Sequence, residues 1–112
     1  MATLVKTYRQ IIEKVLTEYA QLPYAYGELK RQLIIDQAFN HYLLITLGWE
    51  NKKRVHGCLV HIEIINDKIW IQRDGTEQGI ANELVNAGIP KENIVLGFHP
   101  TEVRHYTEYA VS

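Results

Sequence analysis

The stretch HYLLITLGWENKKRVHGCLVHIEIINDKIWIQ, residues 41–72, decides the fold of this chain. It contains three runs rich in Ile, Leu, Val, Tyr and Trp, separated by the polar residues 50–53 and 66–67. Such runs with short polar breaks are typical of β-strands joined by tight turns. A fourth run, RQLIIDQAF at residues 31–39, precedes them. Because strands joined by short connections pair antiparallel, we expect a four-stranded antiparallel sheet.

The third run has one clearly apolar face, because successive side chains of a strand point to opposite sides. That face carries His56, Cys58, Val60, Ile62 and Ile64. We expect it to form the core and Cys58 to be a buried, unreactive thiol. The other face is mixed enough for a groove or an interface, and its residues are Val55, Gly57, Leu59, His61, Glu63 and Ile65.

Helical patterns flank the predicted sheet. Near the N-terminus, apolar residues recur at helical spacing and predict an amphipathic helix that ends near Gln21. After the sheet, the segment DGTE fits a capping box, with Asp74 as the N-cap and Glu77 reaching back to the amide of Asp74. Gly88 stands where a left-handed residue would end this second helix.

The C-terminal part predicts a short helical turn or strand, followed by an ordered tail. Residues 94–96 form an apolar run of only three residues, too short to assign to either type. The tail, HPTEVRHYTEYAVS, places Tyr106, Tyr109 and Val111 among polar residues, so we expect it to dock on its own domain or on a partner. The whole prediction is a single α+β domain over residues 1–112.

Composition narrows the possible classes of protein. The chain has 112 residues and a mass of 13.0 kDa, which favours one domain. Its 12 basic and 13 acidic residues give a net charge of −1. A domain that binds nucleic acid by itself usually has a basic excess, so the charge does not support direct nucleic-acid binding.

The single cysteine excludes an intramolecular disulfide. The early charges Lys6 and Arg9 interrupt any signal-peptide core, so we expect a cytoplasmic protein.

The histidines do not predict a metal site. His56 and His61 are five residues apart, an odd offset that sends them to opposite faces of a regular strand, so that only a bulge could let them share a metal. His61 and Glu63 do share a face, but two possible ligands on one strand are common without a metal. We therefore expect neither a metal site nor a cofactor.

A nuclease pattern is present but weak. Asp36, followed by Glu50-Asn51-Lys52, resembles the carboxylates and lysine that hold Mg²⁺ in many nucleases. Such carboxylates must converge, whereas Glu50 lies where a hairpin should turn. We favour an ordinary solvated turn and assign no catalytic residue.

Binding residues are better candidates than catalytic ones. Lys52, Lys53 and Arg54 could contact a phosphate backbone, although such a small cluster would give weak, salt-sensitive binding. Aromatic side chains often anchor protein interfaces, and the candidates are Trp49, Trp70, Tyr106 and Tyr109. Trp70, between Ile69 and Ile71, could equally belong to the core.

Several long segments of the chain carry a family resemblance. These segments are GWENKKRVHG, HIEI, KIWIQRDGTEQGIANEL, AGIPKENIVLGF and RHYTEYAV, with YRQIIEKVL and QLIID before them. Together they resemble the XisI family, described as the fdxN element excision controlling factor of cyanobacteria, over nearly the whole chain. The one departure is Asn66-Asp67, which stands where an Asp-Gly turn is expected.

The resemblance implies an accessory role in programmed, site-specific excision of a DNA element, beside a recombinase and a companion of the XisH family. XisH-like proteins resemble restriction-type nucleases, and the XisI family has no established catalytic residues to transfer. We expect a non-enzymatic regulator that binds a XisH-like partner. The alternatives are weak direct DNA binding through Lys52, Lys53 and Arg54, or a metal-dependent nuclease using Asp36 and Glu50.

Self-association is a further expectation. A sheet with a mixed second face and only two clear helices leaves apolar surface uncovered, and a two-fold dimer is the commonest way to cover such a surface. We therefore expect a homodimer.

Overall fold

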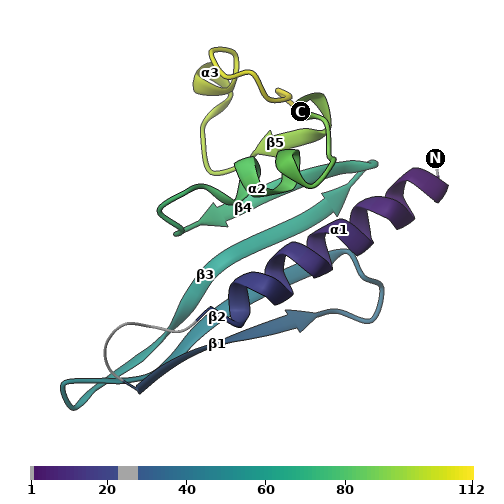
Figure 1. Ribbon diagram of the computed structural model, residues 1–112. Coiled ribbons are helices and arrows are strands. Elements are labelled where there is room, and N and C mark those ends of the chain that lie inside the picture. Colours follow the sequence, from purple (N-terminus) through teal and green to yellow (C-terminus); the bar gives the residue numbers. More distant parts are fainter. Residues whose placement is uncertain (1, 23–27) are drawn as a thin grey trace.

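The computed structural model describes residues 2–22 and 28–112 as a mixed sheet with two helices packed on one face (Figure 1). The elements in chain order are α1 (Ala2–Ala20), β1 (Glu28–Ile35), β2 (His41–Glu50), β3 (Lys53–Ile65), β4 (Lys68–Asp74), α2 (Ile80–Asn86), the 3₁₀ turn η1 (Lys91–Asn93), β5 (Ile94–Leu96) and α3 (Thr101–Arg104). The N-terminal helix and the α+β class are as predicted. Among the described residues, no helix is long and apolar enough to cross a membrane.

The sheet has five strands in the order β1-β2-β3-β4-β5. Its first four strands pair antiparallel, which confirms the predicted meander. The prediction of only four strands is wrong, because Ile94–Leu96 adds β5 parallel to β4. The connection from β4 to β5 runs through α2, as a parallel pair requires a crossover. All three residues of β5 are buried, so tertiary packing selects the strand conformation that three residues alone could not specify.

Two tight turns set the hairpins of the meander. Asn51 and Lys52 join β2 to β3 with φ values of 52° and 67°. Asn66 and Asp67 join β3 to β4 with φ values of 50° and 65°. Two consecutive positive φ angles are the mark of type I′ turns, whose twist matches the strands that they connect. The Asn-Asp pair thus forms the turn without the expected glycine.

Between these turns, β3 carries a β-bulge. Cys58 pairs with Ile45, but Leu44 pairs with Val60, so Leu59 is an extra residue in β3. Because Leu44 and Ile45 are neighbours in β2, their side chains point to opposite faces. Cys58 and Val60 therefore lie on opposite faces too, and the prediction that Cys58 shares the core face is wrong.

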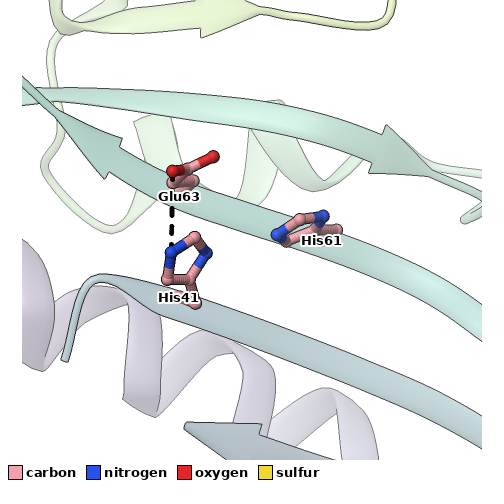
Figure 2. Close-up of side chains that lie close together, drawn as sticks. All are labelled: His41, His61 and Glu63. Atoms are coloured by element: carbon pink, nitrogen blue, oxygen red, sulfur yellow. Dashed lines mark ion pairs between the residues drawn. The ribbon is translucent and has the colours of Figure 1, made fainter. Parts of the chain in front are cut away.

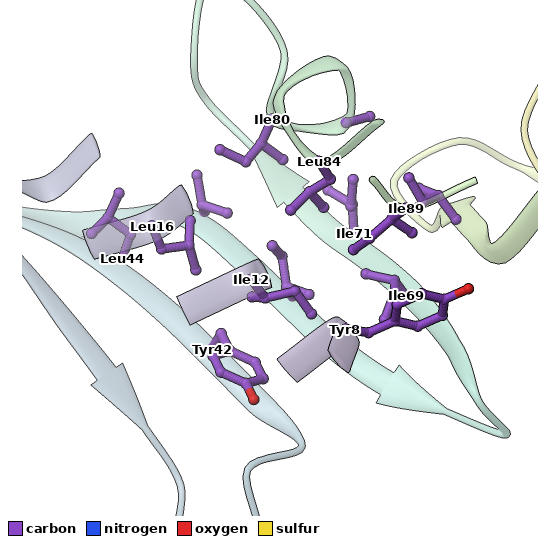
Figure 3. Packing of buried hydrophobic residues seen from close by; sticks show 14 of the residues in the cluster. Tyr8, Ile12, Leu16, Tyr42, Leu44, Ile69, Ile71, Ile80, Leu84 and Ile89 are labelled. Atoms are coloured by element: carbon purple, nitrogen blue, oxygen red, sulfur yellow. The ribbon is translucent and has the colours of Figure 1, made fainter. Parts of the chain in front are cut away.

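The core lies between the sheet and the pair α1 and α2 (Figure 3). The stripe of α1 contributes Tyr8, Ile12 and Leu16, each at most 2% exposed. The sheet contributes fully buried side chains, including Leu44, Val60, Ile62, Ile69 and Ile71, and α2 contributes Ile80 and Leu84. Val60 and Ile62 confirm the predicted core face for the second half of β3.

The start of α2 differs from its predicted capping box. The helix begins at Ile80, with Gly79 in the N-cap position at φ 85°, rather than after Asp74. Asp74 still stabilises the helix start from a distance, because its Oδ2 accepts the backbone N–H of Ile80 at 2.7 Å. Its Oδ1 accepts the N–H of Thr76 at 2.9 Å, whereas Glu77 is exposed. The chain cannot enter a helix at Asp74 because Gly75 continues the pairing with β3, donating its N–H to the carbonyl of Leu59.

The end of α2 is as predicted. Gly88 follows the helix with φ 118°. Its N–H donates to the carbonyl of Val85 at 3.0 Å, and the N–H of Ile89 donates to the carbonyl of Leu84 at 3.0 Å. These two bonds form a Schellman motif, which satisfies carbonyls at the helix end.

The C-terminal tail is ordered and docks on its own domain, one of the two predicted possibilities. Ala110 pairs with Val95 next to β5, and its N–H donates to the carbonyl of Ile94 at 2.9 Å. The guanidinium of Arg104 donates to the carbonyls of His99 and Val111.

Replacing Asp74 tests the helix start. We expect Asp74→Ala to lower the free energy of unfolding by about 1–2 kcal/mol, because it removes the acceptor for the amide of Ile80. The control is Glu77→Ala, which should change stability by less than about 0.5 kcal/mol because Glu77 is exposed. Urea denaturation measures both; equal losses would support the capping box instead.

Two buried tyrosines, Tyr8 and Tyr42, provide a second pair of variants whose stabilities can be compared. The Tyr42 side chain is 1% exposed, and its hydroxyl has no hydrogen-bond partner among the described residues. Burial also raises its pKa to about 12. The Tyr8 hydroxyl, in contrast, accepts a hydrogen bond from Asn93 Nδ2. Denaturant melts should show that Tyr42→Phe raises the free energy of unfolding by about 1 kcal/mol and that Tyr8→Phe lowers it by about the same amount. A loss of stability in Tyr42→Phe would contradict this assignment.

Candidate binding face

The face of β1, β2 and β3 that points away from α1 is here named the open face. Strand registers place on it Lys30, Gln32 and Ile34 from β1; His41, Leu43, Ile45, Leu47 and Trp49 from β2; and Arg54, His56, Cys58, His61 and Glu63 from β3. Figure 1 shows α1 and α2 on the other side of these strands. The mixed second face expected from the sequence is therefore present, although the bulge changes which residues of β3 belong to it.

An apolar stripe runs along the open face. Ile34 is 44% exposed and Trp49 is 48% exposed. Between them on β2 lie Leu43, Ile45 and Leu47, which are half-buried. Contiguous exposed apolar surface of this kind often marks an interaction site.

One end of the stripe reaches the β2–β3 turn, where the structure brings together Trp49 and the predicted basic residues. Trp49 pairs with Arg54, whose guanidinium lies 5.4 Å from the Trp49 ring centre. Lys52 is in the turn itself and Lys53 follows it, and both are exposed. A cation and an indole at this distance attract one another.

Carboxylates lie beside these basic residues. Glu50 pairs with Lys53, and Glu28 pairs with Trp49 from the neighbouring strand. A shallow depression at this end is lined by Glu28, Trp49, Asn51 and Lys52. The two carboxylates therefore offset most of the charge of Lys52, Lys53 and Arg54, so the turn is only weakly basic.

The other predicted aromatics lie away from the β2–β3 turn, although Trp70 pairs with Glu63 and so lies on the same side of the sheet. Trp70 of β4 is half-buried under Arg104, whose guanidinium is 5.1 Å from its ring centre. Tyr109 packs against the core and donates its hydroxyl hydrogen to Asn82 at 3.3 Å. Both residues hold the tail in place. Tyr106 is 92% exposed on the tail, so the four aromatics do not form one surface.

The nuclease pattern does not assemble. Asp36 precedes β2 and Glu50 ends it, so the length of a ten-residue strand, about 30 Å, separates them. The two carboxylates cannot hold one metal ion. Asp36 instead shapes the β1–β2 turn, because its Oδ1 accepts the N–H groups of Asn40 and His41 at 2.8 and 2.9 Å.

Cys58 has the features of an unreactive thiol. It is half-buried, and burial raises the pKa of the thiol above its usual value. A raised pKa leaves little thiolate near neutral pH, which disfavours nucleophilic chemistry.

Three potential metal ligands meet on the open face, which was not predicted. His41 Nε2 lies 3.6 Å from Glu63 Oε2, and the rings of His41 and His61 are 5.8 Å apart (Figure 2). His41 pairs directly with Glu63 because of the bulge in β3. The bulge also puts His56 and His61 on one face, contrary to prediction. A cross-strand register that includes the bulge would have revealed the cluster; spacing along one strand could not.

Comparison with known proteins places the chain in a family. The model of the family described as XisI protein matches residues 1–111. The solved structure of a XisI-like protein from Anabaena variabilis ATCC 29413 is 37% identical, with a TM-score of 0.86, covering 96% of this chain and 99% of that one. The chain is therefore a member of the XisI family.

A second solved structure, the fdxN element excision controlling factor XisI from the same organism, is 36% identical. It has a TM-score of 0.80 and covers 97% of this chain and 99% of its own. A comparison with curated proteins gives no significant match.

The Asp36 carboxylate gives a pH-dependent prediction. The hydrogen bond from the N–H of His41 holds the pKa of Asp36 below its ordinary value of 3.8. Its charge therefore stabilises the fold above that value, and this contribution is lost as the pH falls through the lowered pKa. We expect Asp36→Asn to melt below the wild type at pH 7 and the gap to close in acid.

The matched control is Glu50→Gln at the exposed other end of β2. Its melting temperature should follow that of the wild type across the same pH range. A gap for Asp36→Asn that stays constant down to acid pH would contradict the role of the charge.

Proposed function

We propose that this chain is a non-enzymatic accessory factor that controls excision of a DNA element by binding a XisH-like protein through its open face. Membership of the XisI family and the likeness to a fdxN element excision controlling factor support the role in excision control. The observation that carries the binding mode is the apolar stripe from Ile34 to Trp49 on a face that neither α1 nor α2 covers.

The composition of the open face favours a protein as its occupant. Trp and Arg are over-represented among the residues that dominate binding energy, and Trp49 and Arg54 already stack on one another there. An aromatic anchor held by its neighbour loses little conformational freedom when it binds. Lys30 and Gln32 provide an exposed polar border along β1.

Direct DNA contact is the second candidate, supported by the exposed Lys52, Lys53 and Arg54 at the β2–β3 turn. Three basic side chains can make only a small number of phosphate contacts, and Glu28 and Glu50 oppose them nearby. In this case a mobility shift would weaken steeply with salt and disappear in the Lys52→Ala/Lys53→Ala variant.

A second copy of the chain is the other protein that could cover the open face. We propose a two-fold dimer in the absence of the partner, since such symmetry lets one apolar patch cover itself. Light scattering would then give twice the 13.0 kDa mass of the chain. Ile34→Glu would return the mass to that of a monomer, because it places charge in the stripe.

The partner is tested by co-expression and titration with a XisH-like protein encoded in the same genome. We expect Ile34→Glu and Trp49→Ala to weaken the complex by about tenfold or more, because each removes apolar contact from the stripe. The matched control is Phe98→Ala: Phe98 is 45% exposed, nearly the same as Ile34, but lies outside the open face.

Binding that is unchanged in Phe98→Ala and weak in both other variants supports the proposal. Absence of a complex at micromolar concentration would overturn the choice of partner. Equal weakening in all three variants would overturn the choice of face.

A further inference from the structure

We propose that His41, His61 and Glu63 form a binding site for a divalent transition-metal ion, with Zn²⁺ the best match. The three side chains come from two neighbouring strands, β2 and β3, and converge on the open face (Figure 2). The site shares the open face with the proposed partner surface but does not rest on the proposed function, since metal binding is a property of the chain alone.

The spacing of the ligand atoms fits a small cation. One ligand atom from each residue lies within 4.8 Å of the other two. Bonds of about 2.0–2.1 Å in tetrahedral geometry hold neighbouring ligand atoms about 3.3 Å apart. His41 Nε2 and Glu63 Oε2, at 3.6 Å, are already close to that separation. The separations of up to 4.8 Å must shorten by as much as about 1.5 Å when the ion binds, so the site requires the His61 side chain to move.

The backbone that carries the ligands is firmly held. His41 and Glu63 are directly paired, and His61 pairs with Leu43 two residues further along β2. The N–H of His41 donates to Asp36 Oδ1 at 2.9 Å. Ligands on paired strands keep their relative positions better than ligands on loops.

A neighbouring side chain orients the carboxylate. Gln72 Nε2 donates a hydrogen bond to Glu63 Oε1 at 3.2 Å. This bond leaves the other oxygen, Oε2, facing His41 as the free ligand atom. Outer partners of this kind fix the orientation of metal-binding residues in known sites.

The type of ligands selects the metal. Two imidazoles and one carboxylate suit Zn²⁺, whereas Mg²⁺ and Ca²⁺ prefer sites made only of oxygen. Three protein ligands leave a fourth tetrahedral position for water or for a group from another molecule.

A nearby cation does not occupy the site. Arg73 pairs with His61 from β4, but its Nε donates to the carbonyl of Cys58 at 2.8 Å, which holds the Arg73 side chain against the backbone. An ion pair between His41 and Glu63 would explain those two residues, but would leave unexplained why His61 meets them.

The test is titration of the full chain with Zn²⁺ by calorimetry and with Co²⁺ by visible absorption. We expect one ion per chain, and d–d bands of Co²⁺ typical of a four-coordinate site. His61→Gln and Glu63→Gln should each weaken binding by about tenfold or more, and Gln72→Ala should weaken it less. His56→Gln is the matched control, because His56 lies on the same face of β3 but away from the cluster, and it should bind as the wild type does.

Circular dichroism should show that all variants fold, because the three proposed ligands are half-buried and form no part of the core. No uptake of either metal would overturn the proposal. Uptake that His61→Gln leaves unchanged, or that His56→Gln reduces equally, would place the metal elsewhere and overturn it as well. Failure here would leave the XisH-like complex untouched, because that complex is measured with different variants.

Discussion

The arrangement of both sheet faces depends on one extra residue in β3. From the Asn51-Lys52 turn, β2 and β3 pair regularly as far as Ile45 and Cys58, and then Leu59 is left out of the pairing. Because side chains alternate between faces, a shift of one residue exchanges the two sides of a strand. The bulge therefore lets Val60 and Ile62 enter the core while Cys58 remains on the open face.

The same shift determines which side chains of β3 lie on the open face. It brings Glu63 opposite His41 and puts His61 beside them, while Arg54 stays opposite Trp49 nearer the turn. A regular ladder would pair His41 with Ile62, and the three potential metal ligands would not meet. β-Bulges are known to redirect side chains at functional sites. The metal cluster lies on the strand pair that contains this bulge, and most of the apolar stripe lies on β2 of that pair.

Local patterns were enough to predict the last three strands of the meander with the turns between them, the N-terminal helix and the role of Gly88, whereas β1 ends at Ile35 and not, as its run of residues 31–39 indicated, at Phe39. Each of these follows from side-chain period or turn chemistry within a few residues. The errors concern long-range geometry. Strand β5 exists because Ile94–Leu96 is buried beside β4, and α2 begins late because Gly75 still bonds to Leu59 of β3. No local preference encodes either contact.

Candidate binding residues were predicted only in part. Trp49 and the basic residues 52–54 do lie together, because they flank a two-residue turn that the sequence made evident. Trp70 and Tyr109 instead hold the tail, a role that depends on where residues 104–111 return to the sheet. The near-neutral charge recurs at the turn itself, where carboxylates stand beside the lysines. The small net charge at this turn is one reason to favour a protein rather than DNA as the molecule that binds the open face.

The most direct test of this account is the β2–β3 register measured in solution by cross-strand nuclear Overhauser effects. The account predicts contacts between the backbones of His41 and Glu63, and between those of Ile45 and Cys58, with Leu59 outside the pairing. A regular ladder, with His41 opposite Ile62 and Leu44 opposite Leu59, would contradict it. That result would remove both the metal cluster and the present composition of the open face.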